Sequence, residues 1–179
     1  YYGTSNTRVI AIGSRAGYYS TADSNVYIGY SAGRESRAGT AQVYIGSQAG
    51  YYATGSYNTF VGQDAGQGGT TSAPFSSGEN NTALGYQALV GFTTATRMVA
   101  IGYESMHNVT TGADSVAIGY QAAYYDVGTE SVSIGSYAGM ANGAGSNVSI
   151  GFRAGSTSTG GSNTAIGASA IRYLNAGNE

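Results

Sequence analysis

The chain of 179 residues contains no cysteine and no lysine, one proline, and charged side chains at only 9% of its positions. The absence of cysteine excludes a disulfide framework, thiol catalysis and cysteine-based metal sites. A typical soluble domain carries about 25% charged residues, so this composition is not that of an ordinary globular protein. Glycine supplies 30 residues and hydrophobic residues 41% of the chain, and this apolar content argues against intrinsic disorder.

The sequence also argues against nucleic acid and against a membrane-spanning helix. The formal net charge is −2, and the seven arginines are scattered along the chain. They form no basic stripe, so nucleic acid is not an expected partner. No apolar run approaches the roughly 18 residues that a membrane helix needs, and no signal-peptide pattern opens the chain. Because the first residue is Tyr1 rather than Met, we expect the chain to be a segment of a longer protein.

One short phrase recurs along the whole chain and is clearest at residues 80–89, N-N-T-A-L-G-Y-Q-A-L. Each copy holds one fixed glycine, here called the rung glycine: Gly13, Gly29, Gly46, Gly62, Gly85, Gly102, Gly119, Gly135, Gly151 and Gly167. The steps between them are 16 or 17 residues, with one step of 23. Such a repeat predicts a solenoid. We expect residues 1–179 to form one all-β domain, a parallel β-solenoid or β-roll of ten coils.

The residues before each rung glycine predict a short strand. Val, Thr or Ile stands three positions before it, and Ile, Leu or Val stands directly before it. Two such residues separated by one position share a strand face, and we expect that face to be the inside of the coil. The core predicted in this way includes Val116, Ile118, Ile134 and Ile150, with Gly119 and Gly135 ending two of the strands.

The residue between the two aliphatic positions is then expected to point outward. It is Ala in five copies, Ser in two and aromatic in three, which is too weakly polar for a strand that faces water. A coil this thin also buries few apolar side chains against the entropy lost when it is ordered. We therefore expect self-association along the whole length to cover the outer face.

The longer step between Gly62 and Gly85 contains an insertion at residues 67–79, which holds the only proline of the chain. Insertions in solenoids become loops on one face, often the binding face. Phe75 is therefore a candidate receptor contact. The alternative is a tolerated surface insertion whose Phe75 folds back onto the rod.

Tyrosine recurs directly after the rung glycine, at Tyr86, Tyr103 and Tyr120 in three consecutive copies. Exposed tyrosines beside Gln87 and Gln121 have the composition of a sugar-binding face. The alternative is a ladder of stacked rings that stiffens the rod.

No pattern of residues indicates catalysis or a cofactor. The only histidine, His107, has one nearby carboxylate, Glu104, which falls short of a metal site or an acid–base pair. Carboxylates do not recur at one repeat position, and no hydrolase, metalloprotease or phosphate-loop motif is present. We expect neither an enzyme nor a cofactor.

Three phrases carry a resemblance to known proteins: N-T-A-L-G-Y-Q-A-L (81–89), N-T-F-V-G-Q-D-A-G (58–66) and S-V-A-I-G-Y-Q-A (115–122). They resemble repeats of bacteriophage tail fibres, and they are similar to the head repeats of YadA-like trimeric autotransporter adhesins. The resemblance covers essentially the whole chain. It implies a left-handed homotrimeric β-roll with Val116 and Ile118 in the core and Ala117 near the shared axis. Aromatic residues at Tyr27, Tyr44 and Phe60 depart from the small residue expected at that axis, so either the trimer opens there or the faces are reversed in those coils.

The first functional hypothesis is a non-enzymatic segment of a phage tail fibre or virion fibre, a trimeric rod that supports or forms attachment to a cell-surface polysaccharide or receptor. The second is the head of an adhesin on a bacterial cell surface. A third is a monomeric solenoid that binds a flat ligand such as ice, which regular threonine columns would favour. The first two imply copies of the chain as its own partners.

Overall fold

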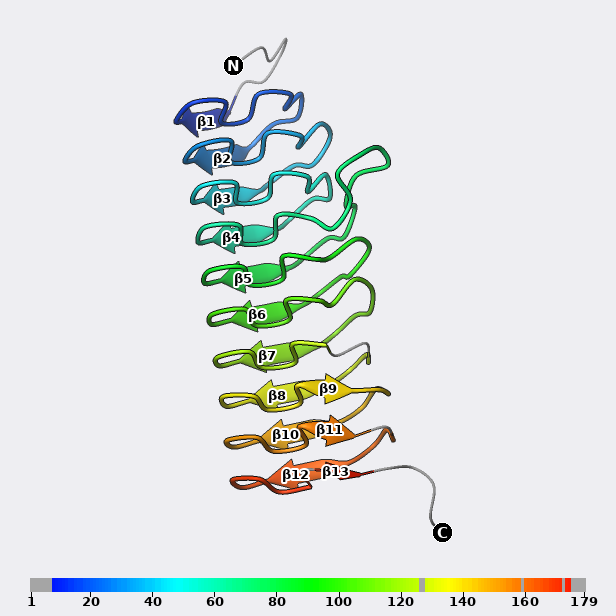
Figure 1. The fold of residues 1–179 in the computed structure, drawn as a ribbon. Coiled ribbons are helices and arrows are strands. Elements are labelled where there is room, and N and C mark those ends of the chain that lie inside the picture. Colours follow the sequence, from blue (N-terminus) through cyan, green and yellow to red (C-terminus); the bar gives the residue numbers. More distant parts are fainter. Residues whose placement is uncertain (1–7, 126–127, 159, 172, 175–179) are drawn as a thin grey trace.

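The computed structural model describes residues 8–125, 128–158, 160–171 and 173–174, and in them the chain winds as a β-solenoid of about ten turns (Figure 1). One strand from each turn joins a ten-stranded parallel sheet in the order β1-β2-β3-β4-β5-β6-β7-β8-β10-β12. Its strands are β1 (Val9–Ile12), β2 (Asn25–Ile28), β3 (Val43–Ile45), β4 (Thr59–Val61), β5 (Thr82–Leu84), β6 (Val99–Ile101), β7 (Val116–Ile118), β8 (Val132–Ile134), β10 (Val148–Ile150) and β12 (Thr164–Ile166). The predicted parallel solenoid is confirmed.

Equivalent positions of successive repeats lie directly above one another. Val116 pairs with Val132 and Ile118 with Ile134, for example. A second parallel sheet, in the order β13-β11-β9, forms on the return path of the last turns from β9 (Ala141–Asn142), β11 (Thr157–Ser158) and β13 (Tyr173–Leu174). At the usual spacing of about 4.8 Å between strands, ten turns give a rod roughly 45 Å long.

The rung glycines lie where the backbones of neighbouring turns approach one another closely. At Gly119, φ is +138° and a Cβ atom would lie 2.6 Å from the carbonyl oxygen of Gly135. No side chain fits in that space, and L-residues rarely adopt this φ. The recurrent glycine therefore both ends the strand and lets the next turn stack upon it.

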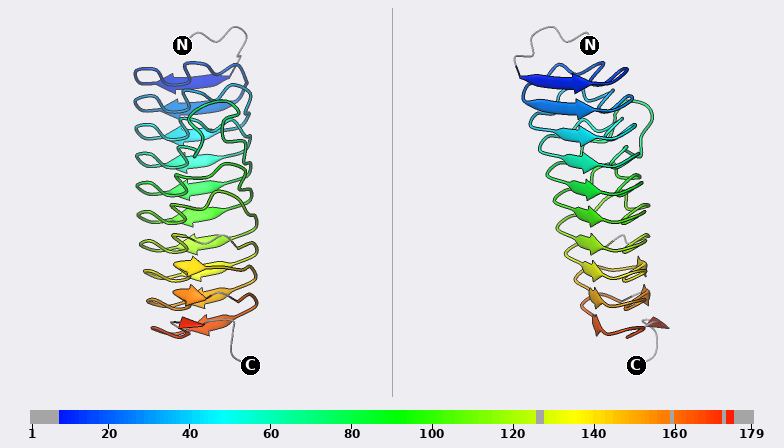
Figure 2. Two further views of the ribbon diagram at one scale, coloured as in Figure 1. Left: turned by 45° about the vertical axis from the view of Figure 1, so that its right-hand side comes forward. Right: turned by 90° about the vertical axis from the view of Figure 1, so that its left-hand side faces the viewer.

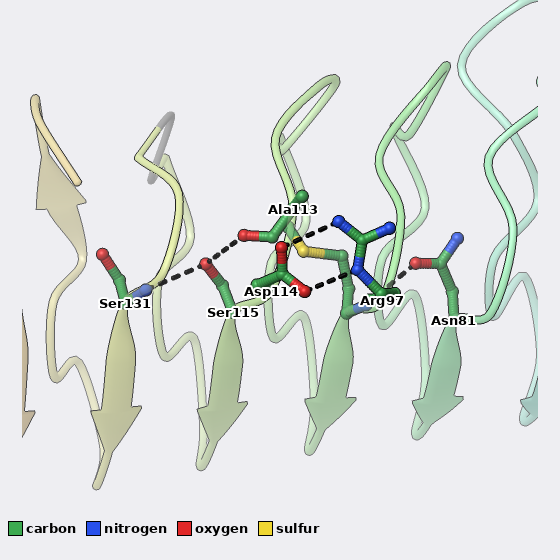
Figure 3. A network of polar contacts seen from close by, with 7 residues as sticks. Asn81, Arg97, Ala113, Asp114, Ser115 and Ser131 are labelled. Atoms are coloured by element: carbon green, nitrogen blue, oxygen red, sulfur yellow. Dashed lines mark hydrogen bonds and ion pairs between the residues drawn. The ribbon is translucent and has the colours of Figure 1, made fainter. Parts of the chain in front are cut away.

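Buried Asn, Gln and Ser side chains join neighbouring turns at the start of most strands of the large sheet. Figure 3 shows three of them, Asn81, Ser115 and Ser131. The Asn81 Oδ1 atom accepts a hydrogen bond from the backbone N–H of Met98 (3.0 Å), and its Nδ2 group donates one to the Ala95 carbonyl (2.8 Å). Ser115 replaces Asn two turns on, and its Oγ accepts from the N–H of Ser131 (3.1 Å). These side chains satisfy backbone groups that the sheet leaves unpaired inside the coil.

The interior of the coil is built from the residue between the two aliphatic positions, which reverses the expectation from the sequence. Ala117 has no exposed surface, whereas Ile118 is 36% exposed. The same holds along the sheet: the buried inner column is Tyr27, Tyr44, Phe60, Ala83, Ala100, Ala117, Ser133, Ser149 and Ala165. The predicted core positions Val116, Ile118, Ile134 and Ile150 instead point outward, and each is half-buried or exposed.

The inner column varies in size, and in several turns a second position compensates for the difference. Tyr44 fills its turn, and the residue four positions after the rung glycine is then Gly50, where a Cβ would lie 2.4 Å from the Tyr44 ring. Two turns later the inner residue is Ala83, and the compensating position is Leu89, fully buried. The aromatic residues are therefore part of a stacked core, in which the Tyr44 and Phe60 rings lie 5.0 Å apart.

The insertion at 67–79 lies against the return path of the coil. In the right-hand view of Figure 2 it projects from the side of the rod where β9, β11 and β13 lie, away from the ten-stranded sheet. A parallel bridge between Ala53 and Ser76 fastens it to the third turn. Among the described residues, no helix is long and apolar enough to cross a membrane.

Replacing Gly119 with Ala is expected to lower the free energy of unfolding by at least about 2 kcal/mol, because the change adds backbone strain and a clash with Gly135. Gly167→Ala is the matched control: its φ is +120°, but no atom lies within 4 Å of the added Cβ. Thermal and denaturant unfolding followed by circular dichroism measures both. Equal losses in the two variants would contradict the close approach of the backbones.

A double-mutant cycle tests the size compensation inside the coil. Tyr44→Ala is expected to cost about 3–5 kcal/mol through the cavity it leaves, and Gly50→Leu to be destabilising because the side chain meets the Tyr44 ring. The double variant recreates the Ala83 and Leu89 pair and should be more stable than the sum of the single losses by at least about 1.5 kcal/mol. Additive losses in denaturant unfolding would argue against the compensation.

Candidate interaction surface

The outer face of the ten-stranded sheet presents two aliphatic columns to solvent. Of the twenty positions three before and one before the rung glycines, seventeen are Val, Ile or Leu and three are Thr. In the second column Ile118 and Ile134 are 36% exposed, Leu84 is 47% exposed and Ile166 is 67% exposed. A soluble monomer rarely exposes a large continuous apolar patch, and such a patch marks an interaction site. We call it the aliphatic face.

A tyrosine column borders the aliphatic face on the side that follows the rung glycines. The rings of Tyr86 and Tyr103 are 5.1 Å apart and those of Tyr103 and Tyr120 are 5.3 Å apart, both pairs stacked. The column continues to Tyr137, edge to face with Tyr120 at 5.2 Å. Because stacked rings cover one another's faces, the column offers ring edges and hydroxyl groups to a ligand. This geometry favours the stiffening role over a platform for sugar rings.

Polar side chains next to the tyrosine column bond to one another along the rod. Gln121 Nε2 donates to Glu104 Oε2 (2.6 Å), and Gln87 Oε1 lies 3.3 Å from His107 Nε2. A hydrogen bond to Glu104 is the main cause that raises the pKa of Tyr103 above its ordinary value of 10.0. These contacts engage Gln87 and Gln121, the predicted sugar contacts, in hydrogen bonds beside the tyrosine column.

The opposite margin of the aliphatic face carries an exposed ion pair (Figure 3). Arg97 donates from Nε to Asp114 Oδ1 (2.5 Å) and from Nη2 to Asp114 Oδ2 (2.8 Å). The hydrogen bonds from Arg97 lower the pKa of Asp114 below its ordinary value of 3.8. An exposed pair of this kind adds little stability, and the charges stay at the margin of the aliphatic face.

Phe75 lies on the rod, not in an isolated loop tip. Its ring stacks on Tyr52 at 5.8 Å, and the Arg37 guanidinium lies 5.4 Å from its centre. Around it the structure gathers residues that the sequence analysis did not single out. Arg34 and Arg37 stand near Tyr19, one turn earlier. The repeat could have predicted that these residues lie together, because steps of 16 and 17 residues place Arg34 between Tyr18 and Tyr51 in the neighbouring turns.

Within the described ranges, no group of three or more His, Cys, Asp or Glu side chains is placed to hold a metal ion. His107 stacks on Tyr124 with ring centres 4.9 Å apart. Its Nδ1 atom lies 3.1 Å from Asn108 Oδ1. His107 is therefore one of the side chains that stack and form hydrogen bonds between neighbouring turns on the surface of the rod.

Glu104→Gln is expected to lower the pKa of Tyr103 toward 10.0, because the variant removes the carboxylate that stabilises the protonated phenol. NMR titration of chain carrying ring-labelled tyrosine measures the change. Glu130→Gln serves as the control, since Glu130 contacts Ser146 and not this column. If Tyr103 titrates at the same pH in all three proteins, the proposed contact between Tyr103 and Glu104 is wrong.

Comparisons with protein-family models, with curated proteins and with solved structures find no match to this chain. The aliphatic face, the tyrosine column and the surface around Phe75 are the features of the chain that bear on its function.

Proposed function

We propose that this chain is a structural and adhesive fibre segment, a rigid homotrimeric rod of a phage tail or virion fibre that supports or forms attachment to a cell-surface glycan or receptor. The observation that carries the proposal is the aliphatic face, which runs the length of the sheet without a charged residue. The repeat phrases 58–66, 81–89 and 115–122 add the resemblance to fibre repeats.

A second copy of the chain is the partner that fits the aliphatic face best. The face repeats at the strand spacing over ten turns, and a partner that covers it evenly must carry the same repeat. Identical rods set side by side in the same direction meet this condition in every turn, and closed rotational symmetry limits their number. The resemblance to trimeric fibres sets that number at three.

The energy available from this contact is large. An Ile side chain that is one-third to two-thirds exposed in the isolated chain gains on the order of 1 kcal/mol when the rest is buried. Summed over the second column alone, the gain is of order 10 kcal/mol, comparable to the cost of association. The first column and the tyrosine edges add to it.

Two other candidates share part of this geometry. The head of a bacterial trimeric adhesin would use the same face in the same way, and a coiled coil with a membrane anchor in the full-length protein would favour it over a fibre. The regular outer face, on which equivalent residues of successive turns lie in register, favours a monomeric ice-binding solenoid. Only Thr59, Thr82 and Thr164 supply hydroxyl groups there, which weakens that candidate.

The oligomeric mass of the chain in solution tests the proposal. Light scattering coupled to size exclusion should give three times the 18.1 kDa chain mass. Ile118→Lys should yield a folded monomer, because position 118 is already 36% exposed within the coil and an added charge opposes burial in the contact.

Thr111→Lys introduces the same charge at an exposed turn residue outside the aliphatic face and should leave the trimer intact. A wild-type monomer would contradict the proposal and favour the ice-binding candidate, which a thermal hysteresis measurement would then examine.

A further inference from the structure

A compact cluster of arginine and aromatic side chains lies beside the insertion, away from the aliphatic face. We call it the Arg37 cluster; it consists of Tyr19, Arg34, Glu35, Arg37, Tyr51, Tyr52 and Phe75. In the right-hand view of Figure 2, the insertion that holds Phe75 lies on the side of the rod opposite the ten-stranded sheet. The cluster therefore stays accessible when copies associate through the aliphatic face.

One buried carboxylate holds two guanidinium groups in this cluster. Glu35, with a side chain only 8% exposed, lies 2.9 Å from Arg37 Nη2 and 3.7 Å from Arg34 Nη1. Two positive charges against one negative charge leave a local excess of +1 on a chain whose net charge is −2. The excess is concentrated at the guanidinium groups.

Arg34 is fixed in place by its neighbours. Its guanidinium lies 5.6 Å from the Tyr19 ring centre and 5.3 Å from the Tyr51 ring centre, and Nη1 donates a hydrogen bond to the Tyr51 hydroxyl. Its Nε atom is buried and has no hydrogen-bond partner among the described residues. A guanidinium held in this way loses little entropy when a ligand binds next to it.

Arg37 is the group that a ligand can reach. Its side chain is 56% exposed, and the guanidinium stands between the Tyr19 ring at 5.1 Å and the Phe75 ring at 5.4 Å. In the described part of the chain, the only hydrogen bond that the Arg37 guanidinium donates runs from Nη2 to Glu35, so its other N–H donors are left for a ligand. Tyr19, 40% exposed, adds ring surface and a hydroxyl group beside them.

We propose that the Arg37 cluster binds the carboxylate of an acidic saccharide, with the guanidinium of Arg37 on the carboxylate and the Tyr19 side chain beside the sugar ring. Guanidinium groups pair with carboxylates through two parallel hydrogen bonds, and the exposed tyrosine supplies an amphipathic contact for the ring. This inference rests on the proposed attachment function and adds the chemical class of the ligand.

The cluster also fastens the insertion, since Phe75 stacks on Tyr52 beneath Arg37. If fastening were its only role, loss of the Arg37 charge would lower the stability of the insertion and leave saccharide binding unchanged. The two roles are therefore separated by measuring thermal unfolding and binding on the same variants.

The test uses the full chain and immobilised polygalacturonate, with soluble dextran and poly-glutamate as competitors. Arg37→Gln is expected to weaken binding at least 10-fold, because it removes a charge-assisted hydrogen bond. Arg153→Gln is the matched control: it makes the same charge change at an arginine that lies over Tyr137 and Phe152, and it should change binding less than 2-fold. Poly-glutamate at equal carboxylate concentration should compete more weakly than free oligogalacturonate, and dextran should not compete.

Three results would overturn the inference. The first is that the wild-type chain is not retained on polygalacturonate, the second is that Arg37→Gln and Arg153→Gln weaken binding equally, and the third is that poly-glutamate competes as strongly as oligogalacturonate at equal carboxylate concentration. Arg37→Lys, which keeps the charge but loses the planar donor pair, should bind with intermediate affinity. The oligomeric mass is recorded for every variant. A chain that is monomeric yet binds polygalacturonate would contradict the fibre proposal alone, and a trimer that fails to bind would contradict this inference alone.

Discussion

The structure depends on the close approach of successive turns at the rung glycines. A Cβ at Gly85 or Gly102 would lie 2.5 Å from a carbonyl oxygen of the next turn, so a turn on which another turn stacks must carry glycine at this place. The same stacking brings equivalent strand residues into register and lets the buried Asn and Ser side chains bond from one turn to the next. The sequence repeats regularly because every turn must meet the same packing constraints.

A coil this narrow has room for one strand side chain per turn, and that limit decides which residues face outward. The inner column takes Ala, Ser or an aromatic residue, with Gly50 or Leu89 adjusting the remaining space. The branched Val and Ile residues then occupy the outer side of the same strands, where β-branched residues suit the pleated backbone. Much of the aliphatic surface of the sheet is thereby left exposed in the single chain, and this exposure is the reason that we propose self-association.

The sequence alone predicted the number of turns, the parallel stacking and the strand positions, because each follows from the spacing of the glycines. It predicted correctly that Val116 and Ile118 share a face. The prediction that this face lies inside the coil was wrong, because both residues point outward. Alternation reports which residues lie together and not which side is interior, and the assumption that aliphatic residues lie inside holds for a chain that folds alone. The pairing of Tyr44 with Gly50, and of Ala83 with Leu89, was the signal that could have settled the side. The Arg37 cluster was missed because its members come from different turns and the insertion.

The central claim is that the aliphatic columns point out of the coil and meet the same columns of other copies. The chain has no native cysteine, so single cysteines at adjacent positions test it directly by oxidative cross-linking, which requires Cα atoms within about 7 Å. Ile118→Cys is predicted to form disulfide-linked pairs of chains, and Ala117→Cys to remain uncross-linked and protected from thiol reagents in the folded protein. Cross-linking through position 117, with position 118 protected and uncross-linked, would contradict the account.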